Sequence, residues 1–159
     1  MGAGKTSIGK LLAKKLKMDF FDTDAELEAR AGVSISWIFD VEGEAGMRER
    51  EVAVIEELTC MHNIILATGG GSILRPENRS ALTSRGTVVY LQASIDQQVN
   101  RTANNRDHRP LLQVKDTRGK IEELAKIRDP LYIDIADYTV STKAGSAHDV
   151  VIKILDQLR

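Results

Sequence analysis

The stretch Met1-Gly-Ala-Gly-Lys-Thr-Ser7 opens the chain and matches the end of the phosphate-loop pattern G-x-x-x-x-G-K-[ST]. Gly2 and Gly4 carry no Cβ, so consecutive backbone N–H groups can turn toward a phosphate, and a helix starting near Lys5 adds the positive end of its dipole. Lys5 is suited to neutralise the β and γ phosphates, and the Thr6 hydroxyl is suited to ligate Mg²⁺. The stretch therefore predicts a nucleoside triphosphate site at the start of a helix.

The leading Gly of the pattern would lie before Met1, together with the strand that delivers the loop. We therefore expect the first strand of the sheet to be missing or truncated. Each buried unsatisfied backbone group costs about 1–3 kcal/mol, against a net stability of about 5–15 kcal/mol, so the chain alone is expected to fold poorly and to have little activity. Two other interpretations of this start are a disordered segment and the myristoylation pattern Met1-Gly2-x-x-x-Thr6.

Length and composition predict one compact domain over residues 1–159. The chain has 159 residues, of which 42% are hydrophobic and 28% charged, enough to bury one core without division. A net charge of −1 argues against bulk nucleic-acid binding. One cysteine, Cys60, cannot form an internal disulfide, and no long apolar run or signal-peptide pattern is present. We therefore expect a cytoplasmic, monomeric protein with no nucleic-acid or membrane partner.

Helical and extended patterns alternate along the chain, which predicts an α/β fold with a parallel sheet covered on both faces. The predicted strands are 19–21, 64–67, 87–91 and 138–140. The predicted helices are 5–16, 25–30, 34–39, 44–61, 76–85, 95–104, 121–136, interrupted at Pro130, and 147–158.

Polar residues and glycines follow two of these strands, at the edge where ligands bind in such sheets. Asp22 and Asp24, one residue apart, suit a metal and substrate hydroxyl groups. The alternative is that Asp24 only caps the following helix. Three glycines, residues 69–71, predict backbone lying against a small ligand, with a tight turn as the alternative.

Together with two arginine motifs, these segments resemble the shikimate kinase family along the whole chain. Arg48 and Arg128 alone would be read as surface charges, but the combination of motifs in one order is specific. The matching stretches are Met1-Gly-Ala-Gly-Lys-Thr6, Phe21-Asp-Thr-Asp24, Glu42-Gly-Glu-Ala-Gly-Met-Arg48 with Glu51, Ala67-Thr-Gly-Gly-Gly-Ser72, Arg109-Pro-Leu-Leu112 and Arg128-Asp-Pro-Leu-Tyr132.

The resemblance implies a three-layer P-loop kinase fold, with five parallel strands in the family, of which the first and central one is missing or truncated here. It implies ATP-dependent phosphorylation of the shikimate 3-hydroxyl, in aromatic amino acid biosynthesis, with Mg²⁺ as cofactor and ATP as co-substrate. Other possibilities are another small-molecule P-loop kinase, such as a gluconate kinase, and a non-catalytic protein that binds shikimate or nucleotide.

The resemblance also implies residue roles. Arg48 and Arg128 would grip the shikimate carboxylate, while Asp24 would orient the hydroxyls and is the candidate to accept the proton. Main-chain N–H groups of Gly69, Gly70 and Gly71 would face the substrate. Thr6 would ligate Mg²⁺ directly and Asp22 through water. The implied catalytic residues are Lys5, Asp24 and Arg109, and the implied nucleotide contacts are Gly2, Ala3, Gly4, Lys5, Thr6, Ser7, Arg101, Arg109, Gly145 and Ser146.

Arg109 lies in a segment, about residues 106–118, that resembles the family's lid. On closure it would reach the transferring phosphoryl group beside Lys5 and exclude water. The alternative is a solvated loop charge. Arg101 resembles the residue that stacks on adenine, and Gly145 and Ser146 belong to the loop that wraps the adenine edge.

Overall fold

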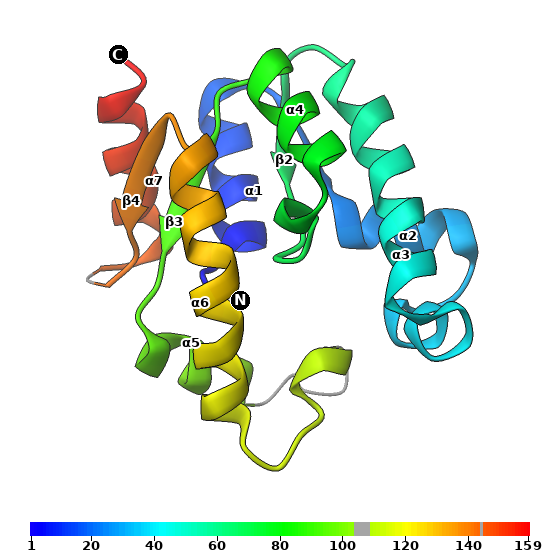
Figure 1. Ribbon diagram of the computed structural model, residues 1–159. Helices are drawn as coiled ribbons and strands as arrows, with labels where there is room; N and C mark the ends of the chain where they lie inside the picture. Colours follow the sequence, from blue (N-terminus) through cyan, green and yellow to red (C-terminus); the bar gives the residue numbers. More distant parts are fainter. Residues whose placement is uncertain (104–108, 144) are drawn as a thin grey trace.

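The structure is a computed structural model that describes residues 1–103, 109–143 and 145–159 (Figure 1). Helices and strands alternate through these residues, and most of their bounds agree with the sequence pattern. The α-helices are α1 (Lys5–Leu16), α2 (Thr23–Ala31), α3 (Ile35–Thr59), α4 (Pro76–Arg85), α5 (Ile95–Thr102), α6 (Thr117–Ile135) and α7 (Ala147–Gln157). The strands are β1 (Asp19–Asp22), β2 (Ile64–Ala67), β3 (Val89–Gln92) and β4 (Tyr138–Ser141), and two short 3-10 helices are η1 (Ser72–Leu74) and η2 (Pro110–Leu112).

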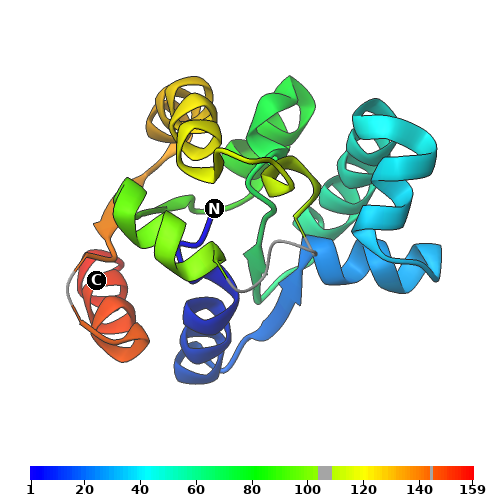
Figure 2. The same cartoon turned by 90° about the horizontal axis from the view of Figure 1, so that it is seen from below.

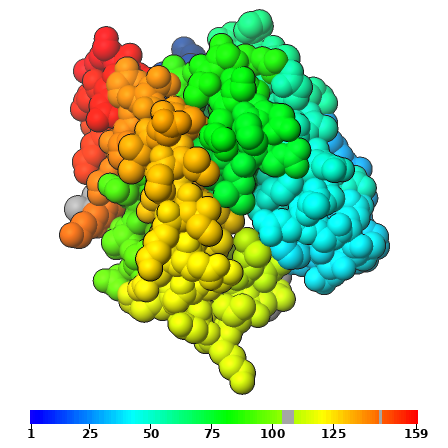
Figure 3. All heavy atoms as spheres, viewed as in Figure 1, coloured from blue at the N-terminus to red at the C-terminus, as the bar shows by residue number. Residues whose placement is uncertain are grey.

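The strands form two parallel pairs. Strand β1 pairs with β2 in the register Asp19 to Ile64, and β3 pairs with β4 in the register Val89 to Tyr138. Seen from below, α1 and α7 cover one face of the strands, and α3, α4 and α6 cover the other (Figure 2). The last three lie side by side on the molecular surface (Figure 3). The predicted α/β class with parallel strands is confirmed, and the helices complete a three-layer arrangement.

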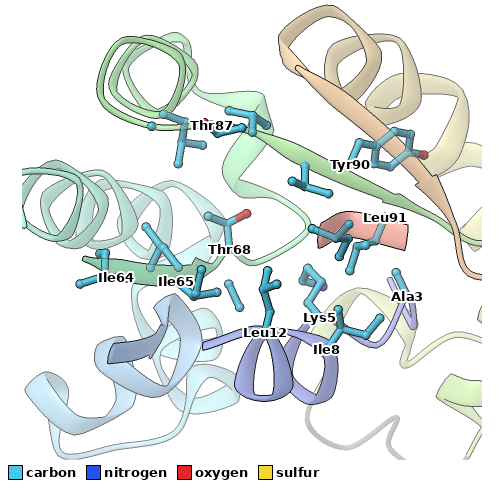
Figure 4. Close-up of a pocket in the computed structure, with 18 of the residues that line it drawn as sticks. Ala3, Lys5, Ile8, Leu12, Ile64, Ile65, Thr68, Thr87, Tyr90 and Leu91 are labelled. Carbon is cyan, nitrogen blue, oxygen red and sulfur yellow. The ribbon is translucent and has the colours of Figure 1, made fainter. Parts of the chain in front are cut away.

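A cavity of about 530 Å³ lies between β2 and β3 (Figure 4). Among the described residues no backbone ladder joins these two strands, so the sheet is divided at this point, the arrangement expected of a family sheet whose central strand is missing or truncated. Side chains of both strands line the cavity, including Ile65 and Leu91, and Ile8 and Leu12 of α1 close it from one side. The walls are therefore largely apolar.

Two apolar clusters hold the helices on the strands. The larger cluster joins α1 to β4 and α7 through Ile8, Leu12, Val140, Val150, Val151 and Ile154. The smaller one joins α2 to α3 through Leu27, Val54 and Leu58. Burial of each such side chain contributes about 1.5–3 kcal/mol. Helix α1 is therefore fixed along its length, and its first turn, which carries the phosphate-loop residues, has a defined position.

Local signals explain where several helices begin and break. The Ser34 side chain caps α3, and within that helix Gly43 has φ 73° and ψ 177°, so the chain breaks there. The separate predicted helices 34–39 and 44–61 correspond to the two parts. Helix α4 begins with Pro76 and ends before Gly86. These are the positions that proline and glycine favour at helix ends.

The predicted lid segment, residues 106–118, is only partly a loop. Residues 106–108 lie outside the described residues. Pro110–Leu112 forms η2, and α6 begins at Thr117, earlier than the predicted 121, because the Asp116 side chain accepts a hydrogen bond from the Gly119 N–H. Helix α6 also continues through Pro130, where the sequence predicted an interruption.

Candidate active site

The phosphate loop presents free N–H groups at the start of α1. Gly2 and Gly4 have φ values of 66° and 87°, which other residues adopt only with strain. Gly4 is the N-cap of α1, no side chain caps the helix, and its first turn contains no acidic residue. The Thr6 and Ser7 side chains are exposed beside it, whereas Ala3 is buried. The helix start therefore has the geometry and partial positive charge that bind an anion.

Lys5, Asp24 and Arg109 act on one another electrostatically and so lie at one site. Burial lowers the pKa of Lys5, the Asp24 charge opposes this shift, and the Arg109 charge adds to it. Burial also lowers the pKa of Arg109, again opposed by Asp24. Lys5 lies at the head of α1 beside the cavity (Figure 4). The structure thus brings the three predicted catalytic residues together.

The side chains of Thr6 and Asp22, both predicted metal ligands, lie side by side. The Thr6 hydroxyl donates to Asp22 Oδ2 at 2.8 Å. The other carboxylate oxygen, Oδ1, accepts from the N–H groups of Asp24 at 3.0 Å and Ala25 at 3.5 Å. Asp22 is therefore the N-cap of α2, which begins at Thr23, and the alternative that Asp24 caps this helix is wrong.

The Asp24 carboxylate is left free for chemistry. It keeps access to solvent, but the surrounding protein atoms partly desolvate it. This desolvation, followed by the charge of Asp22, raises the pKa of Asp24 to about 6, and the Lys5 charge opposes the shift. A carboxylate with this pKa is mostly ionised at pH 7 and can still accept a proton, as a general base requires.

Residues 69–71 are glycines because charged groups approach their backbone. An added Cβ at Gly69 would lie 2.8 Å from Asp24 Oδ1, and one at Gly70 would lie 3.2 Å from Arg128 Nη1. At Gly71 it would overlap the Arg48 guanidinium. None of the three has a positive φ, so the turn itself does not require glycine. Close approach, and not the alternative of a tight turn, explains the triple glycine.

The N–H groups of these glycines are not equally free. The Gly69 N–H donates to Thr23 Oγ1 at 2.9 Å, which removes it from the set expected to face a ligand. Within residues 1–103, 109–143 and 145–159, no hydrogen bond is found from the N–H groups of Gly70 and Gly71. These two are the available donors of the loop.

Arg48 is buried in a network of carboxylates. Its side chain is 8% exposed, and its Nη1 donates to Glu51 Oε2 at 2.9 Å. Nη2 donates to Glu44 Oε1 at 3.3 Å. Glu51 is fully buried and also accepts from the Ser72 hydroxyl at 2.6 Å. Glu51 had no role in the sequence interpretation, although its i, i+3 spacing from Arg48 on a helix could have indicated the ion pair.

Arg128 is buried and has no hydrogen-bond or ion-pair partner in the described part of the chain. It is 4% exposed, its Nε has no acceptor, and no ion pair or hydrogen bond of its guanidinium is found among the described residues. Burial lowers the pKa of Arg128, although the group remains charged because an arginine pKa starts so high. A buried cation without a counter-ion is costly, so the site is suited to an anionic ligand.

Arg101 connects the phosphate loop to the end of β4. Its Nη1 donates to the Gly2 carbonyl at 3.0 Å and to Thr142 Oγ1 at 3.3 Å. Gly145 follows, with φ 109°, and Ser146 is the N-cap of α7. The Ser146 hydroxyl and N–H are both engaged with Asp149 in a capping box, a role that the sequence interpretation did not assign. Residue 144 lies outside the described residues.

The fold and site define a P-loop kinase with an anion site beside the phosphate loop: an uncapped helix start, a Thr6–Asp22 pair and two buried arginines. The family model for shikimate kinase matches residues 1–159. The chain therefore belongs to the shikimate kinase family, and the predicted class of enzyme, an ATP-using transferase and kinase, is confirmed. The gluconate kinase alternative is set aside.

Individual relatives agree with this assignment over nearly the whole chain. The shikimate kinase of Pseudomonas syringae pv. tomato is 54% identical over 158 residues, which cover 99% of this chain and 91% of that protein. That of Legionella pneumophila strain Corby is 51% identical, with 99% and 90% covered. The solved structure of shikimate kinase from Acinetobacter baumannii in complex with shikimate superposes with a TM-score of 0.97 at 47% identity, covering 99% of this chain and 88% of that one.

None of the described helices is both long and apolar enough to cross a membrane.

Proposed function

We propose that the phosphate loop holds ATP while Arg48 and Arg128 bind the shikimate carboxylate, so that the γ-phosphoryl group passes to the shikimate 3-hydroxyl. The observation that carries this proposal is the buried guanidinium of Arg128 beside the glycine loop, for which residues 1–103, 109–143 and 145–159 provide no hydrogen-bond or ion-pair partner. A carboxylate would satisfy it with charge-assisted hydrogen bonds, because a guanidinium presents a planar fork that fits two carboxylate oxygens.

Arg48 and Arg128 contribute differently to binding of the carboxylate. Arg48 already has Glu51 as a counter-ion, so it contributes a fixed donor and little net charge. Arg128 contributes a positive charge that no described residue pairs directly, although Glu44 and Glu51 favour it from a distance. Gly70 and Gly71 lie against the two guanidinium groups, and their free N–H groups are additional donors for the substrate. Such a set selects a small anionic ring with hydroxyl groups.

The reacting atoms meet between Asp24 and Lys5. The shikimate 3-oxygen attacks the γ-phosphorus, its proton passes to the Asp24 carboxylate, and the bond from the γ-phosphorus to the β–γ bridging oxygen breaks, which releases ADP. Lys5 and Arg109 neutralise the oxygens of the transferring group. Because the transition state is loose, positioning and charge neutralisation supply most of the catalysis.

Mg²⁺ fits the donor set at Thr6 and Asp22. This ion keeps several waters and takes one or two protein oxygens together with phosphate oxygens, and a hydroxyl 2.8 Å from a carboxylate supplies such a pair. Thr6 would bind the ion directly and Asp22 through water. When bound, Mg²⁺ neutralises charge on the β and γ phosphates.

Arg101 and the loop before α7 bind the adenine ring of ATP. The Gly2 and Thr142 bonds of Arg101 use its N–H groups, which lie in the guanidinium plane, so its face is free to stack on an adenine ring. Ser146 is committed to the cap of α7, and Gly145, without a side chain, can lie close to the adenine edge. A net charge of −1 supports the absence of a nucleic-acid partner, and a single cysteine supports a cytoplasmic location; we also keep the expectation of a monomer without a membrane partner.

The test is turnover measured separately from binding. ADP release in a coupled assay should depend on both ATP and shikimate, and gluconate should not replace shikimate. Calorimetric titrations with each ligand alone identify the alternative. Binding of shikimate and ATP without ADP release would mean a non-catalytic binding protein, and absence of shikimate binding would refute the proposal.

A further inference from the structure

Tyr132 ties helix α6 to the glycine loop. It lies one helical turn after Arg128, and its hydroxyl donates to the Gly70 carbonyl oxygen. Its ring stacks on Tyr90 of β3, with centroids 5.0 Å apart and planes at 25°. The Tyr90 hydroxyl in turn donates to Asp129 Oδ1 at 3.1 Å. The Tyr132 hydroxyl is therefore held in place by both its helix and the neighbouring strand.

This bond joins the two strand pairs at the lining of the cavity between them. Gly70 follows β2, whereas Tyr132 and Tyr90 belong to α6 and β3, and no ladder links β2 to β3 among the described residues. An added Cβ at Gly70 would lie 3.2 Å from Arg128 Nη1 and 3.4 Å from the Tyr132 hydroxyl oxygen. Arg128 and Tyr132 thus contact the same glycine from one face of α6.

Holding the Gly70 carbonyl fixes the next N–H group. The carbonyl of Gly70 and the N–H of Gly71 belong to one planar trans peptide, so they point in opposite directions. Glycine alone would allow this peptide to rotate widely. Thr23 fixes the loop one residue earlier, through the Gly69 N–H. Tyr132 is the group that fixes the peptide between Gly70 and Gly71.

We propose that Tyr132 is a positioning residue for shikimate, which sets the Gly71 N–H and the Arg128 guanidinium in one arrangement before the substrate binds. The inference rests on the proposed function, in which Arg128 and the glycine loop contact the shikimate carboxylate. Tyr132 acts through Gly70 and does not touch the reacting atoms. Its loss should weaken shikimate binding and leave the phosphate loop, on α1, unaffected.

The test is Tyr132→Phe, which keeps the ring stacked on Tyr90 and removes only the hydroxyl. Loss of one hydrogen bond of ordinary strength should raise the KM and the calorimetric Kd for shikimate about three- to tenfold. The KM for ATP and kcat should change less than about twofold. The matched control is Tyr90→Phe, which removes the bond to Asp129, keeps the same ring pair, and should leave the shikimate KM unchanged.

Several outcomes would overturn the inference. A shikimate KM unchanged in Tyr132→Phe would mean that the hydroxyl positions nothing. Equal increases in Tyr132→Phe and Tyr90→Phe, or equal increases in the KM values for shikimate and ATP, would indicate a packing role alone. Arg128→Ala, assayed beside them, separates the two proposals. If this variant binds shikimate normally, the proposed carboxylate site is wrong whatever Tyr132 does.

Discussion

Arg128→Met should weaken substrate binding without weakening the fold. The guanidinium is buried with no counter-ion among the described residues, so the free protein carries the cost of desolvating an unpaired charge. Methionine has a similar length and no charge, so it removes that cost. A gain of about 1 kcal/mol would raise the Tm by about 2–4 °C in a chain of this size.

Substrate binding should change in the opposite sense. Removing one partner of a desolvated charge pair costs about 2–5 kcal/mol, which corresponds to a roughly 30- to 5,000-fold rise in the Kd for shikimate. The same loss should appear in thermal melts. Shikimate at 100 times its wild-type Kd stabilises the wild-type protein by about 2.7 kcal/mol, and the same concentration should stabilise Arg128→Met by less than about 1 kcal/mol.

Arg48→Met is the matched control, because Arg48 is equally buried but paired. Its removal leaves the fully buried Glu51 without its cation, and breaking such a pair costs about 3–5 kcal/mol of stability. Thermal denaturation of both variants, with and without shikimate, decides the matter. If Arg128→Met lowers the Tm as far as Arg48→Met does, Arg128 is satisfied within the protein, and the argument for an anion site at this position is refuted.

Three further predictions concern the reacting groups. Asp24→Asn should lower kcat by about 100-fold or more while ATP still binds, measured by ADP release and nucleotide titration; near-normal turnover would exclude Asp24 as base. Because the pKa of Asp24 is raised to about 6 and the base must be ionised, kcat/KM should fall about tenfold per pH unit below about pH 6, and this acid limb should be absent in Asp24→Asn. Arg109→Ala should lower kcat much more than shikimate affinity, because the side chain meets the phosphates only on closure. An ATP analogue with shikimate should also protect the predicted lid, residues 106–118, from trypsin, and unchanged cleavage there would mean an exposed loop.

The sequence predicted helices best where the end signals are local. The bounds of α1 and α4 agree with the prediction, because glycine before Lys5 and Pro76 with Gly86 act within a few residues. The start of α6 depends on the Asp116 side chain, a weaker signal, and it was placed four residues late. Periodicity does not indicate the division of the strands into two pairs, but the family resemblance does, because it places the missing or truncated strand at the centre of the sheet.

In the candidate site, too, local features could be predicted from the sequence and long-range contacts could not. Residue types at the strand ends indicated Asp22, Asp24 and the glycine loop. Their hydrogen-bond partners could not be predicted, since Thr23 reaches Gly69 across 46 residues and Tyr132 reaches Gly70 across 62. The spacing of Glu51 from Arg48 on one helix indicates their ion pair, but the sequence gives no sign that Arg128 lacks such a pair, because this depends on which carboxylates the fold brings near.

The cavity between β2 and β3 has a consequence for local unfolding. Groups that meet at the substrate site belong to different strand pairs: Asp24 and Gly70 follow β1 and β2, whereas Arg128 lies on α6, between β3 and β4. Because, in the described part of the chain, the pairs share only the packing of α1 and side-chain contacts such as Tyr132 with Gly70, and no ladder is found between them, each can open with its own free energy, as separate cooperative units do. A ligand that contacts both pairs binds only when both are closed. Shikimate should therefore slow amide hydrogen exchange in both pairs and make them exchange as one unit.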